Sequence, residues 1–202
     1  MGNARDNETR QRIVDAASVL FRKKGLDGVN MRELAERADV NKGLLHYYFK
    51  TKEAVFREVF GSQVKLFYGE VGALLHAPGP LRDKVPVLVD NYFRMFGENP
   101  GLPAFVLFEM QRDPSIMVRI GVRDILQEVI AAVEPELKRA KLPAARASGM
   151  HFIMDVLGLC AFTFGTLPGV NKVMKFNKTQ RAAYLLDRKT HIIALIRQGL
   201  KP

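Results

Sequence analysis

The sequence predicts an all-α protein of two parts, a three-helix N-terminal head and a larger helical body. Apolar residues recur at offsets of three and four through most of the 202 residues, which is the period of an amphipathic helix. No run of alternating apolar and polar residues is long enough to predict a strand. With 48% hydrophobic and 26% charged residues, the chain can bury a sizeable core.

Residues 30–52 contain the most informative motif, a short helix, a tight turn and a second short helix. The apolar face of the first helix consists of Met31, Leu34, Ala35 and Ala38. Asn30 and Glu33 form a capping-box pattern, because the Asn side chain can accept from orphan amides while the carboxylate reaches back. The turn at 38–40 precedes Asn41, which is placed to cap the second helix. This arrangement predicts a helix-turn-helix, whose second helix fits a DNA major groove.

The stretch Gly25 to Lys52, GLDGVNMRELAERADVNKGLLHYYFKTK, resembles the DNA-binding signature of the TetR family of transcriptional repressors. The resemblance covers the first quarter of the chain, and its matching positions include Gly25, Leu34, Ala35, Ala38, Val40, Gly43, Leu45, Phe49 and Lys52. Asp39 stands where the family usually has a turn glycine, a position expected to need a positive φ. The other departures from the usual pattern are Asn30 and Leu44 in place of Thr or Ser, and His46 in place of Tyr.

Eight residues of the motif are predicted to contact DNA: Asn30, Arg32, Lys42, Gly43, Leu44, His46, Tyr47 and Lys52. The second motif helix, 41–49, is expected to bury Leu45 and Phe49 and to turn its other face outward. Lys42 lies in its first turn, where a side chain can reach a guanine edge or a phosphate. Tyr47 offers a ring and a hydroxyl to the same groove.

The remaining predicted DNA contacts have more varied roles. Gly43 allows close backbone approach, and Leu44 can press on a thymine methyl group. Arg32 matches a family position that can reach a base, and its planar fork suits guanine. The residues predicted to contact phosphates are Asn30, His46 and Lys52. For each residue the alternative is an ordinary exposed helix position.

The head and the body are predicted to share one helix. A first helix, 7–24, ends at Gly25 and completes the three-helix head. Thr51 is placed to cap a fourth helix, which continues into the body without a Gly/Ser linker. We therefore predict a helix-turn-helix DNA-binding domain over 1–52 and a ligand-binding and dimerisation domain over 53–202.

The body is predicted to be helical throughout. Its expected helices are 51–75, 81–97, 103–112, 115–139, 144–164 and 179–199. Pro135 is expected to kink its helix or to split off the last turn, and a loop is expected around Pro168 and Gly169. The apolar run 150–170 is interpreted as a buried helix plus this loop rather than as a membrane span, because Asp155 and several Gly and Pro positions interrupt it.

The last two predicted helices are apolar on more than one side. Such a helix must be covered all round, either by its own core or by a partner chain, and the residues alone leave both possibilities open. The TetR resemblance implies a homodimer, because members of that family generally dimerise through a four-helix bundle made from the last two helices of each chain. The predicted interface residues are Phe152, Val156, Leu185, Ile192 and Ile196.

The body is also rich in aromatic and methionine side chains, which pack a core more often than they line a pocket. The resemblance implies an apolar effector pocket among the fourth to eighth helices. The predicted ligand-binding residues are Phe67, Tyr92, Phe96, Phe105, Phe108, Glu109, Met154 and Asp155. Glu109 and Asp155 stand in apolar surroundings, where each either selects a ligand with a donor or positive charge or forms a satisfied contact between helices.

The sequence contains none of the common catalytic or metal-site motifs. Its four His residues are scattered, and there is no H-E-x-x-H, G-x-S-x-G or P-loop. His151 and Asp155 would share a helix face, but the spacing points to no further metal ligand. We therefore predict that the protein is not an enzyme and needs no metal or cofactor.

A formal net charge of +10 favours a polyanionic partner. Residues 1–60 hold 12 Lys and Arg against 9 Asp and Glu, whereas the remainder holds 19 against 12. The motif, rather than net charge, therefore marks the head as the DNA-binding part.

The single cysteine, Cys160, and the lack of an apolar signal-peptide core at the N-terminus predict a cytoplasmic protein without a membrane partner.

Together these features predict a ligand-responsive transcriptional regulator that binds double-stranded operator DNA as a homodimer. It is expected to be a repressor that a small apolar or amphipathic effector releases from a palindromic operator. The alternative is a helix-turn-helix protein whose C-terminal part only dimerises and has no small-molecule effector.

Overall fold

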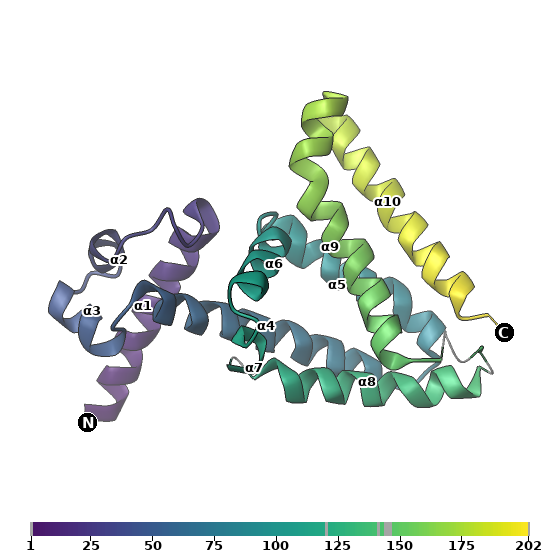
Figure 1. The fold of residues 1–202 in the computed structure, drawn as a ribbon, viewed down its shortest axis with the longest axis horizontal. Helices are drawn as coiled ribbons and strands as arrows, with labels where there is room; N and C mark the ends of the chain where they lie inside the picture. Colours follow the sequence, from purple (N-terminus) through teal and green to yellow (C-terminus); the bar gives the residue numbers. More distant parts are fainter. Residues whose placement is uncertain (1, 120, 141, 144–146, 202) are drawn as a thin grey trace. The chain divides into compact units, whose positions relative to one another are not determined.

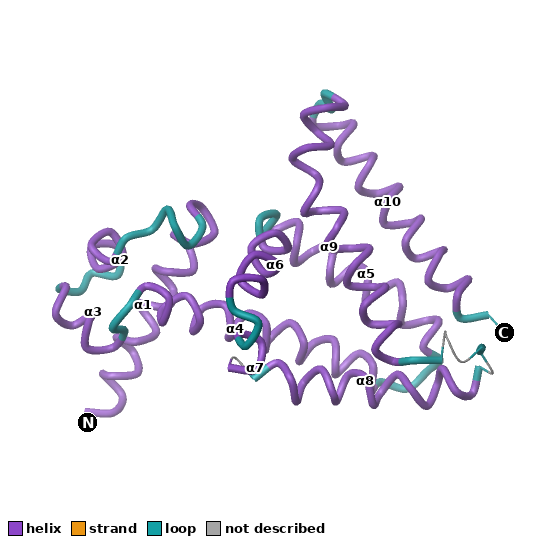
Figure 2. The backbone as a smooth tube through the Cα atoms, viewed as in Figure 1, coloured by secondary structure: helices purple, strands orange, loops and turns teal. Residues whose placement is uncertain are grey.

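The computed structural model describes residues 2–119, 121–140, 142–143 and 147–201, and within them it contains helices and loops but no strand (Figures 1 and 2). The helices are α1 Gly2–Lys24, α2 Met31–Arg37, α3 Lys42–Tyr48, α4 Lys52–His76, α5 Leu81–Glu98, α6 Leu102–Arg112, α7 Ile116–Arg119, α8 Val122–Arg139, α9 Gly149–Met174 and α10 Lys178–Gly199. The predicted all-α class is confirmed.

The chain divides by packing into two compact units. The head unit holds residues 1–66 and 109–122, and the body unit holds residues 67–108 and 123–202. Helix α4 contributes residues to both units, as expected for a shared helix. The packing boundary lies after Leu66, whereas the predicted functional boundary follows Lys52.

The core of the head unit lies between α1, α2, α3 and the first turns of α4. Fully buried side chains in it include Ile13 of α1, Leu34 of α2, Leu45 of α3 and Val55 of α4. The rings of Phe21 and Phe56 meet edge to face, with centroids 5.1 Å apart. This apolar centre holds the two short helices, which are too short to be stable alone.

Helix α1 begins five residues earlier than predicted, at Gly2 instead of residue 7. A long-range contact lies within the extension, where the Tyr48 hydroxyl donates to Asp6 Oδ1 at 2.6 Å. The predicted end of α1 is confirmed. The Gly25 backbone has φ 68°, and its N–H donates to the Phe21 carbonyl at 2.9 Å, so glycine closes the helix in a left-handed conformation.

The body unit is built around α5, α9 and α10, which pack against one another (Figure 1). Their shared core consists of Val85, Leu88, Val89, Tyr92, Phe96, Phe152, Ile153, Val156, Cys160, Phe164, Ile192 and Ile196. The buried residues of α5 recur at offsets of three and four, so they form one apolar stripe along the helix. This stripe packs against α9 and α10.

The helix breaks predicted at two prolines are absent. Helix α8 continues through Pro135 to Arg139, and the buried Val133 and Leu137 anchor the helix on both sides of the ring. Helix α9 likewise continues through Pro168 to Met174, so the predicted loop is absent there. Phe164 and Leu167 are buried immediately before Pro168, while the ring itself faces solvent. Tertiary packing therefore outweighs the lost backbone hydrogen bond.

Other helix boundaries also differ from the prediction. The expected helix 115–139 is divided into α7 and α8, and Gly121 with φ 75° lies at the break. Helix α9 begins at Gly149 rather than 144, where Ser148 accepts from the His151 N–H at 3.3 Å. Residues 144–146 lie outside the described residues.

Helix α9 is long and apolar enough to cross a membrane by length and composition. One such helix is weak evidence for a span, because the core helix of a soluble protein passes the same test. A third of its most apolar window is buried inside the chain, which leaves a broad apolar surface uncovered by this chain.

Candidate nucleic-acid interface

The first motif helix, α2, is capped by Asn30. Its Oδ1 accepts from the Glu33 N–H at 2.9 Å, as predicted. The Glu33 carboxylate accepts instead from Lys24 Nζ at 2.6 Å, so the ion pair ties α2 to the end of α1. Because the Asn30 side-chain oxygen is occupied, its amide group remains for the predicted phosphate contact.

The turn between the motif helices contains Asp39 with φ 53°. This value confirms the expected positive φ at a position where the TetR pattern usually has glycine. The Val40 N–H donates to the Ala35 carbonyl at 3.0 Å, which closes the turn. Asp tolerates the left-handed region better than most residues that carry a Cβ.

The second motif helix, α3, is oriented from both sides. Asn41 Oδ1 accepts from the Leu44 N–H at 2.7 Å, which confirms the predicted cap. Leu45 and Phe49 are buried, as predicted. A Cβ on Gly43 would lie 3.3 Å from Asn41 Oδ1, so the glycine also leaves room for the cap.

The outward face of α3 carries its predicted DNA-reading residues. Tyr47 is 73% exposed, and Lys42, Gly43 and His46 are also exposed, while Leu44 is half-buried. The Tyr47 ring meets the Tyr48 ring edge to face, with centroids 5.2 Å apart. The hydrogen bond to Asp6 raises the pKa of Tyr48, so this neighbour stays a neutral donor. The two adjacent tyrosines therefore differ, since one faces solvent and the other is tied to α1.

Two further predicted contacts flank α3. Arg32 is exposed, and its Nε donates to Glu36 Oε1 at 3.0 Å, an ion pair that solvent weakens. Lys52 is half-buried at the start of α4, where Thr51 Oγ1 accepts from the Ala54 N–H at 3.2 Å. A hydrogen bond from its own backbone N–H lowers the pKa of Glu53, so a carboxylate already occupies this helix terminus. A phosphate contact here would depend on the Lys52 side chain.

The amino-acid sequence of this region matches a family model. Residues 13–59 match the model described as bacterial regulatory proteins, tetR family. Residues 13–59 are thus similar to the DNA-binding domain of the TetR family. The matched segment runs from α1 through the first turns of α4, so it includes the whole candidate interface.

Curated transcriptional regulators match part of this chain. The HTH-type transcriptional repressor KstR of Mycolicibacterium smegmatis (strain ATCC 700084 / mc(2)155) is 30% identical over 100 residues, which are 50% of this chain and 49% of that protein. The probable HTH-type transcriptional regulator YttP of Bacillus subtilis (strain 168) is 46% identical over 44 residues, 22% of this chain and 21% of that protein. The chain thus spans about half or less of the length of the relatives it matches.

Solved structures resemble the entire fold at low identity. The transcriptional regulator FadR from Bacillus subtilis, in complex with stearoyl-CoA, has a TM-score of 0.70 at 16% identity, with 94% of this chain and 98% of that chain covered. A putative TetR-family regulator from Mesorhizobium loti has a TM-score of 0.67 at 19% identity, with 97% and 96% covered. At these identities the likeness shows a shared fold.

The predicted ligand-binding residues are divided between core and surface. Tyr92 and Phe96 fill the core of the body unit, where burial raises the pKa of Tyr92 well above its usual value. Phe108 is 56% exposed, and Met154 and Asp155 also face solvent. The side chains of Phe67, Phe105 and Glu109 lie outside the described part of the structure. The described members are thus not gathered in one place by burial, and the ligand site stays a prediction.

Four of the five predicted dimer-interface residues lie in the core of the single chain. Phe152, Val156, Ile192 and Ile196 are buried there, and the interface itself stays a prediction. They lie on the side of α9 and α10 that packs inside the body unit. The exposed apolar residues of these two helices are Met150, Met154, Phe162, Val173, Met174, Leu186 and Leu195. Sequence periodicity could not separate the two faces because both are apolar.

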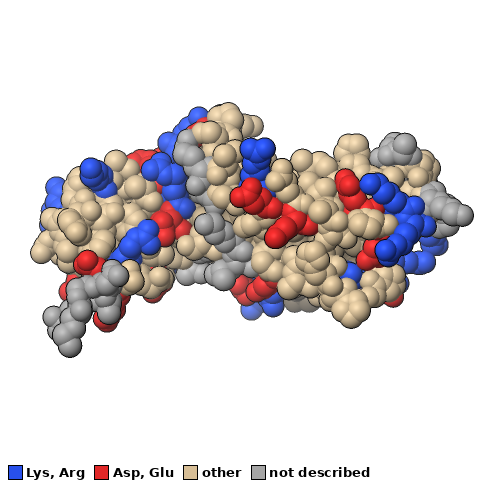
Figure 3. All heavy atoms as spheres, turned by 90° about the horizontal axis from the view of Figure 1, so that it is seen from below, with Lys and Arg blue, Asp and Glu red and all other residues tan. Residues whose placement is uncertain are grey.

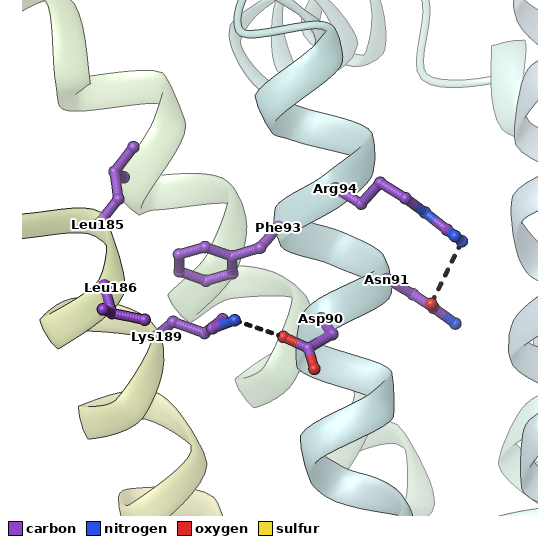
Figure 4. Close-up of a pocket in the computed structure, with 7 residues that line it drawn as sticks. All are labelled: Asp90, Asn91, Phe93, Arg94, Leu185, Leu186 and Lys189. Carbon is purple, nitrogen blue, oxygen red and sulfur yellow. Dashed lines mark hydrogen bonds and ion pairs between the residues drawn. The ribbon is translucent and has the colours of Figure 1, made fainter. Parts of the chain in front are cut away.

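Leu185, the fifth predicted interface residue, instead lines an open groove of about 450 Å³ (Figure 4). The other lining residues are Asp90, Asn91, Phe93, Arg94, Leu186 and Lys189, from α5 and α10. Lys189 Nζ pairs with Asp90 Oδ1 at 2.7 Å, and Arg94 pairs with Glu70 at 2.9 Å. The sequence carries no signal for this groove, because residues far apart in the chain form it.

Proposed function

We propose that this protein is a DNA-binding transcriptional regulator that acts as a homodimer, and that the outward face of α3 reads the operator. The observation that carries the proposal is the solvent-facing set on α3, with Tyr47 73% exposed on a helix that Leu45 and Phe49 anchor. A mostly exposed tyrosine can offer both its ring and its hydroxyl to another molecule. The TetR-family segment around them supports the same use.

Within this proposal the eight predicted residues divide into two roles. Lys42, Gly43, Leu44, Tyr47 and Arg32 face base edges in the major groove, where hydrogen bonds and methyl contacts distinguish sequences. The proposed phosphate contacts are Asn30, His46 and Lys52. Phosphate contacts fix register, so their loss weakens binding to all duplexes alike.

The proposal is tested by selecting an operator from a random duplex library and measuring affinity across salt concentrations by fluorescence anisotropy. A near-palindromic site with steep salt dependence is expected, because phosphate contacts release counterions. Lys52→Ala should flatten the salt slope by about one unit without changing sequence preference. Failure to enrich any sequence would contradict the proposal.

For assembly we propose an interface on the exposed faces of α9 and α10. Phe162 is 70% exposed and Leu186 62% exposed, and most of the apolar window of α9 is not buried within the chain. A second copy would cover these side chains and would place two heads on two half-sites. The family resemblance supports this arrangement.

Light scattering on Phe162→Glu and Leu186→Glu tests the interface. Each variant should be a folded monomer that loses operator affinity, because both residues are exposed in one chain. Phe108→Glu, also at an exposed apolar position, is the control and should remain dimeric. Intact dimers in the first two variants would move the interface elsewhere.

For regulation we propose a repressor released by a small apolar or amphipathic effector. A relative in fold is described in complex with stearoyl-CoA, so long-chain acyl-CoA is a suitable first probe in a thermal-shift screen. Any ligand that releases DNA must bind more weakly in the presence of saturating operator, because coupling between sites is reciprocal. Equal affinity with and without operator, measured by calorimetry, would contradict this mechanism.

A body that only dimerises is the second candidate. The observation that favours it is the packing of Tyr92 and Phe96, two residues predicted to bind ligand, inside the core. In that case operator affinity should be unchanged by every compound that the thermal-shift screen identifies. The same release assay therefore separates the two candidates.

A further inference from the structure

We propose that the end of the body unit formed by the first turn of α5 and the last turns of α10 binds the phosphate group of a small molecule. A hollow of about 330 Å³ lies there, lined by Arg82, Ala194, Arg197, Gln198 and Lys201. Its size is near the lower end of small-ligand sites in proteins. The inference goes beyond the proposed operator binding and does not depend on it.

The hollow contains more positive than negative charge. Arg82, Arg197 and Lys201 contribute three cations to its lining, which includes no carboxylate. Among the described residues, Asp83 is the carboxylate paired with this set, and its Oδ1 lies 3.6 Å from an Arg197 terminal nitrogen. That separation is too long for a hydrogen bond. A surplus of about two positive charges therefore remains, which matches a doubly charged phosphate.

One donor in this hollow lacks an acceptor. Arg197 Nε is buried and has no hydrogen-bond partner among the described atoms. A buried N–H without a partner is unfavourable, and a bound anion would satisfy it after a shift of the Arg197 side chain that exposes Nε. Because a guanidinium presents its donors in a planar fork, Arg197 and Arg82 can each hold phosphate oxygens in a bidentate manner.

The carboxylate at the nearby start of α5 does not compensate these cations. Glu136 of α8 accepts from the Leu81 N–H and from Lys84 Nζ, the latter at 3.3 Å. Lys84 is buried and also donates to the Leu75 carbonyl at 2.7 Å, so Lys84 and Glu136 form a closed pair. The charges of Arg82 and Lys201 are thereby left for a ligand.

The wider surface has the same sign. Figure 3 shows Lys and Arg side chains gathered at the end of the body unit where the last turns of α8 and α10 lie in Figure 1. Exposed Lys138 and Arg139 belong to the last turn of α8. Such a field raises the local concentration of anions and steers them to the hollow. This site also gives a use to the positive charge that the sequence places outside the head.

Calorimetry with inorganic pyrophosphate tests the site on the full chain. Wild type should bind it saturably, and Arg82→Gln/Lys201→Gln should bind about tenfold more weakly or worse, since each charge-assisted hydrogen bond is worth about one such factor. Lys178→Gln/Arg181→Gln removes the same charges from the opposite end of α10 and should change the affinity less than about twofold.

Three outcomes would overturn the proposal. They are no saturable binding by wild type, equal weakening in both double variants, and displacement of pyrophosphate by a short non-operator duplex at lower concentration. The third outcome would assign the surface to nucleic acid. Operator affinity of Arg82→Gln/Lys201→Gln, measured without pyrophosphate, should equal that of wild type. A failure of this site is therefore distinguishable from a failure of operator binding.

Discussion

The first turn of the candidate recognition helix in the head unit and the buried Lys84 of the body unit are held by contacts of different sequence range. In the head, Asn41 caps α3 through an amide three residues away, and Asp39 closes the preceding turn. In the body, Lys84 reaches the Leu75 carbonyl of α4 and Glu136 of α8, which lies 52 residues away in the chain. Local contacts therefore start the candidate recognition helix, and the Tyr48–Asp6 hydrogen bond ties its last residue to α1, whereas the buried Lys84 of the body depends on partners far away in the chain.

This difference predicts which substitutions should change DNA binding and which should change the free energy of unfolding. Side chains on the outward face of α3 have few neighbours, so their loss should change DNA binding more than stability. Buried groups of the body have many neighbours, so their loss should change stability first. The following predictions, from the largest effect to the smallest, test this contrast.

The largest effect concerns Cys160, the single cysteine, which lies in the core of the body unit. Burial raises the pKa of its thiol from 9.0 to about 12. At pH 8 the folded chain should therefore react with Ellman's reagent about a thousandfold more slowly than the chain in denaturant, following the thiolate fraction. Stability should fall as pH rises from 9 towards 12, because the unfolded chain then releases a proton that the folded chain keeps. A reaction rate that titrates near pH 9 in the folded state would show that the body opens easily.

Lys84→Met should give the next largest effect. It removes the buried ammonium, leaves the Leu75 carbonyl without its donor and leaves Glu136 without its cation. Such an unpaired group costs about 3 kcal/mol of unfolding free energy. Arg94→Met, on the same helix, breaks an exposed pair with Glu70 and should cost about 0–1 kcal/mol. Equal losses in urea denaturation would contradict a body held by buried polar contacts.

Asn41→Ala should have a smaller effect on stability. Loss of the α3 cap should cost about 1 kcal/mol of unfolding free energy, and operator affinity should fall because the first turn of α3 loosens. Asn177→Ala removes the corresponding cap of α10, part of a complete capping box in the body. That variant should lose similar stability while operator affinity is preserved. Urea denaturation and fluorescence anisotropy measure the stability and the operator affinity of both variants. An equal fall in operator affinity for Asn177→Ala would contradict a specific role of the α3 cap in DNA binding.

The same contrast explains how much could be predicted from sequence. The caps by Asn30, Asn41 and Thr51 and the positive φ of Asp39 depend on a few consecutive residues, so the pattern predicted them. The contact of α1 with Tyr48 could not be predicted, because it joins residues 42 positions apart.

In the body, more features depend on long-range packing and could not be predicted from local sequence patterns. The path of α9 through Pro168 depends on packing around Phe164 and Leu167, which no local pattern reveals. The assignment of Ile192 to core rather than interface required the three-dimensional packing of α5, α9 and α10. By contrast, Gly121 at the break between α7 and α8 was a readable signal that the prediction missed.

The most direct test of the central claim measures the affinity and sequence preference of Tyr47→Ala and Lys42→Ala for a selected operator by fluorescence anisotropy. Each variant should keep the wild-type melting temperature, because both side chains are exposed. Each should also lose about 1–3 kcal/mol of discrimination for every base contact removed. Lys178→Ala, which removes an exposed cation at the start of α10, should bind like wild type. Unchanged affinity and preference in both α3 variants would contradict the claim that this face reads DNA.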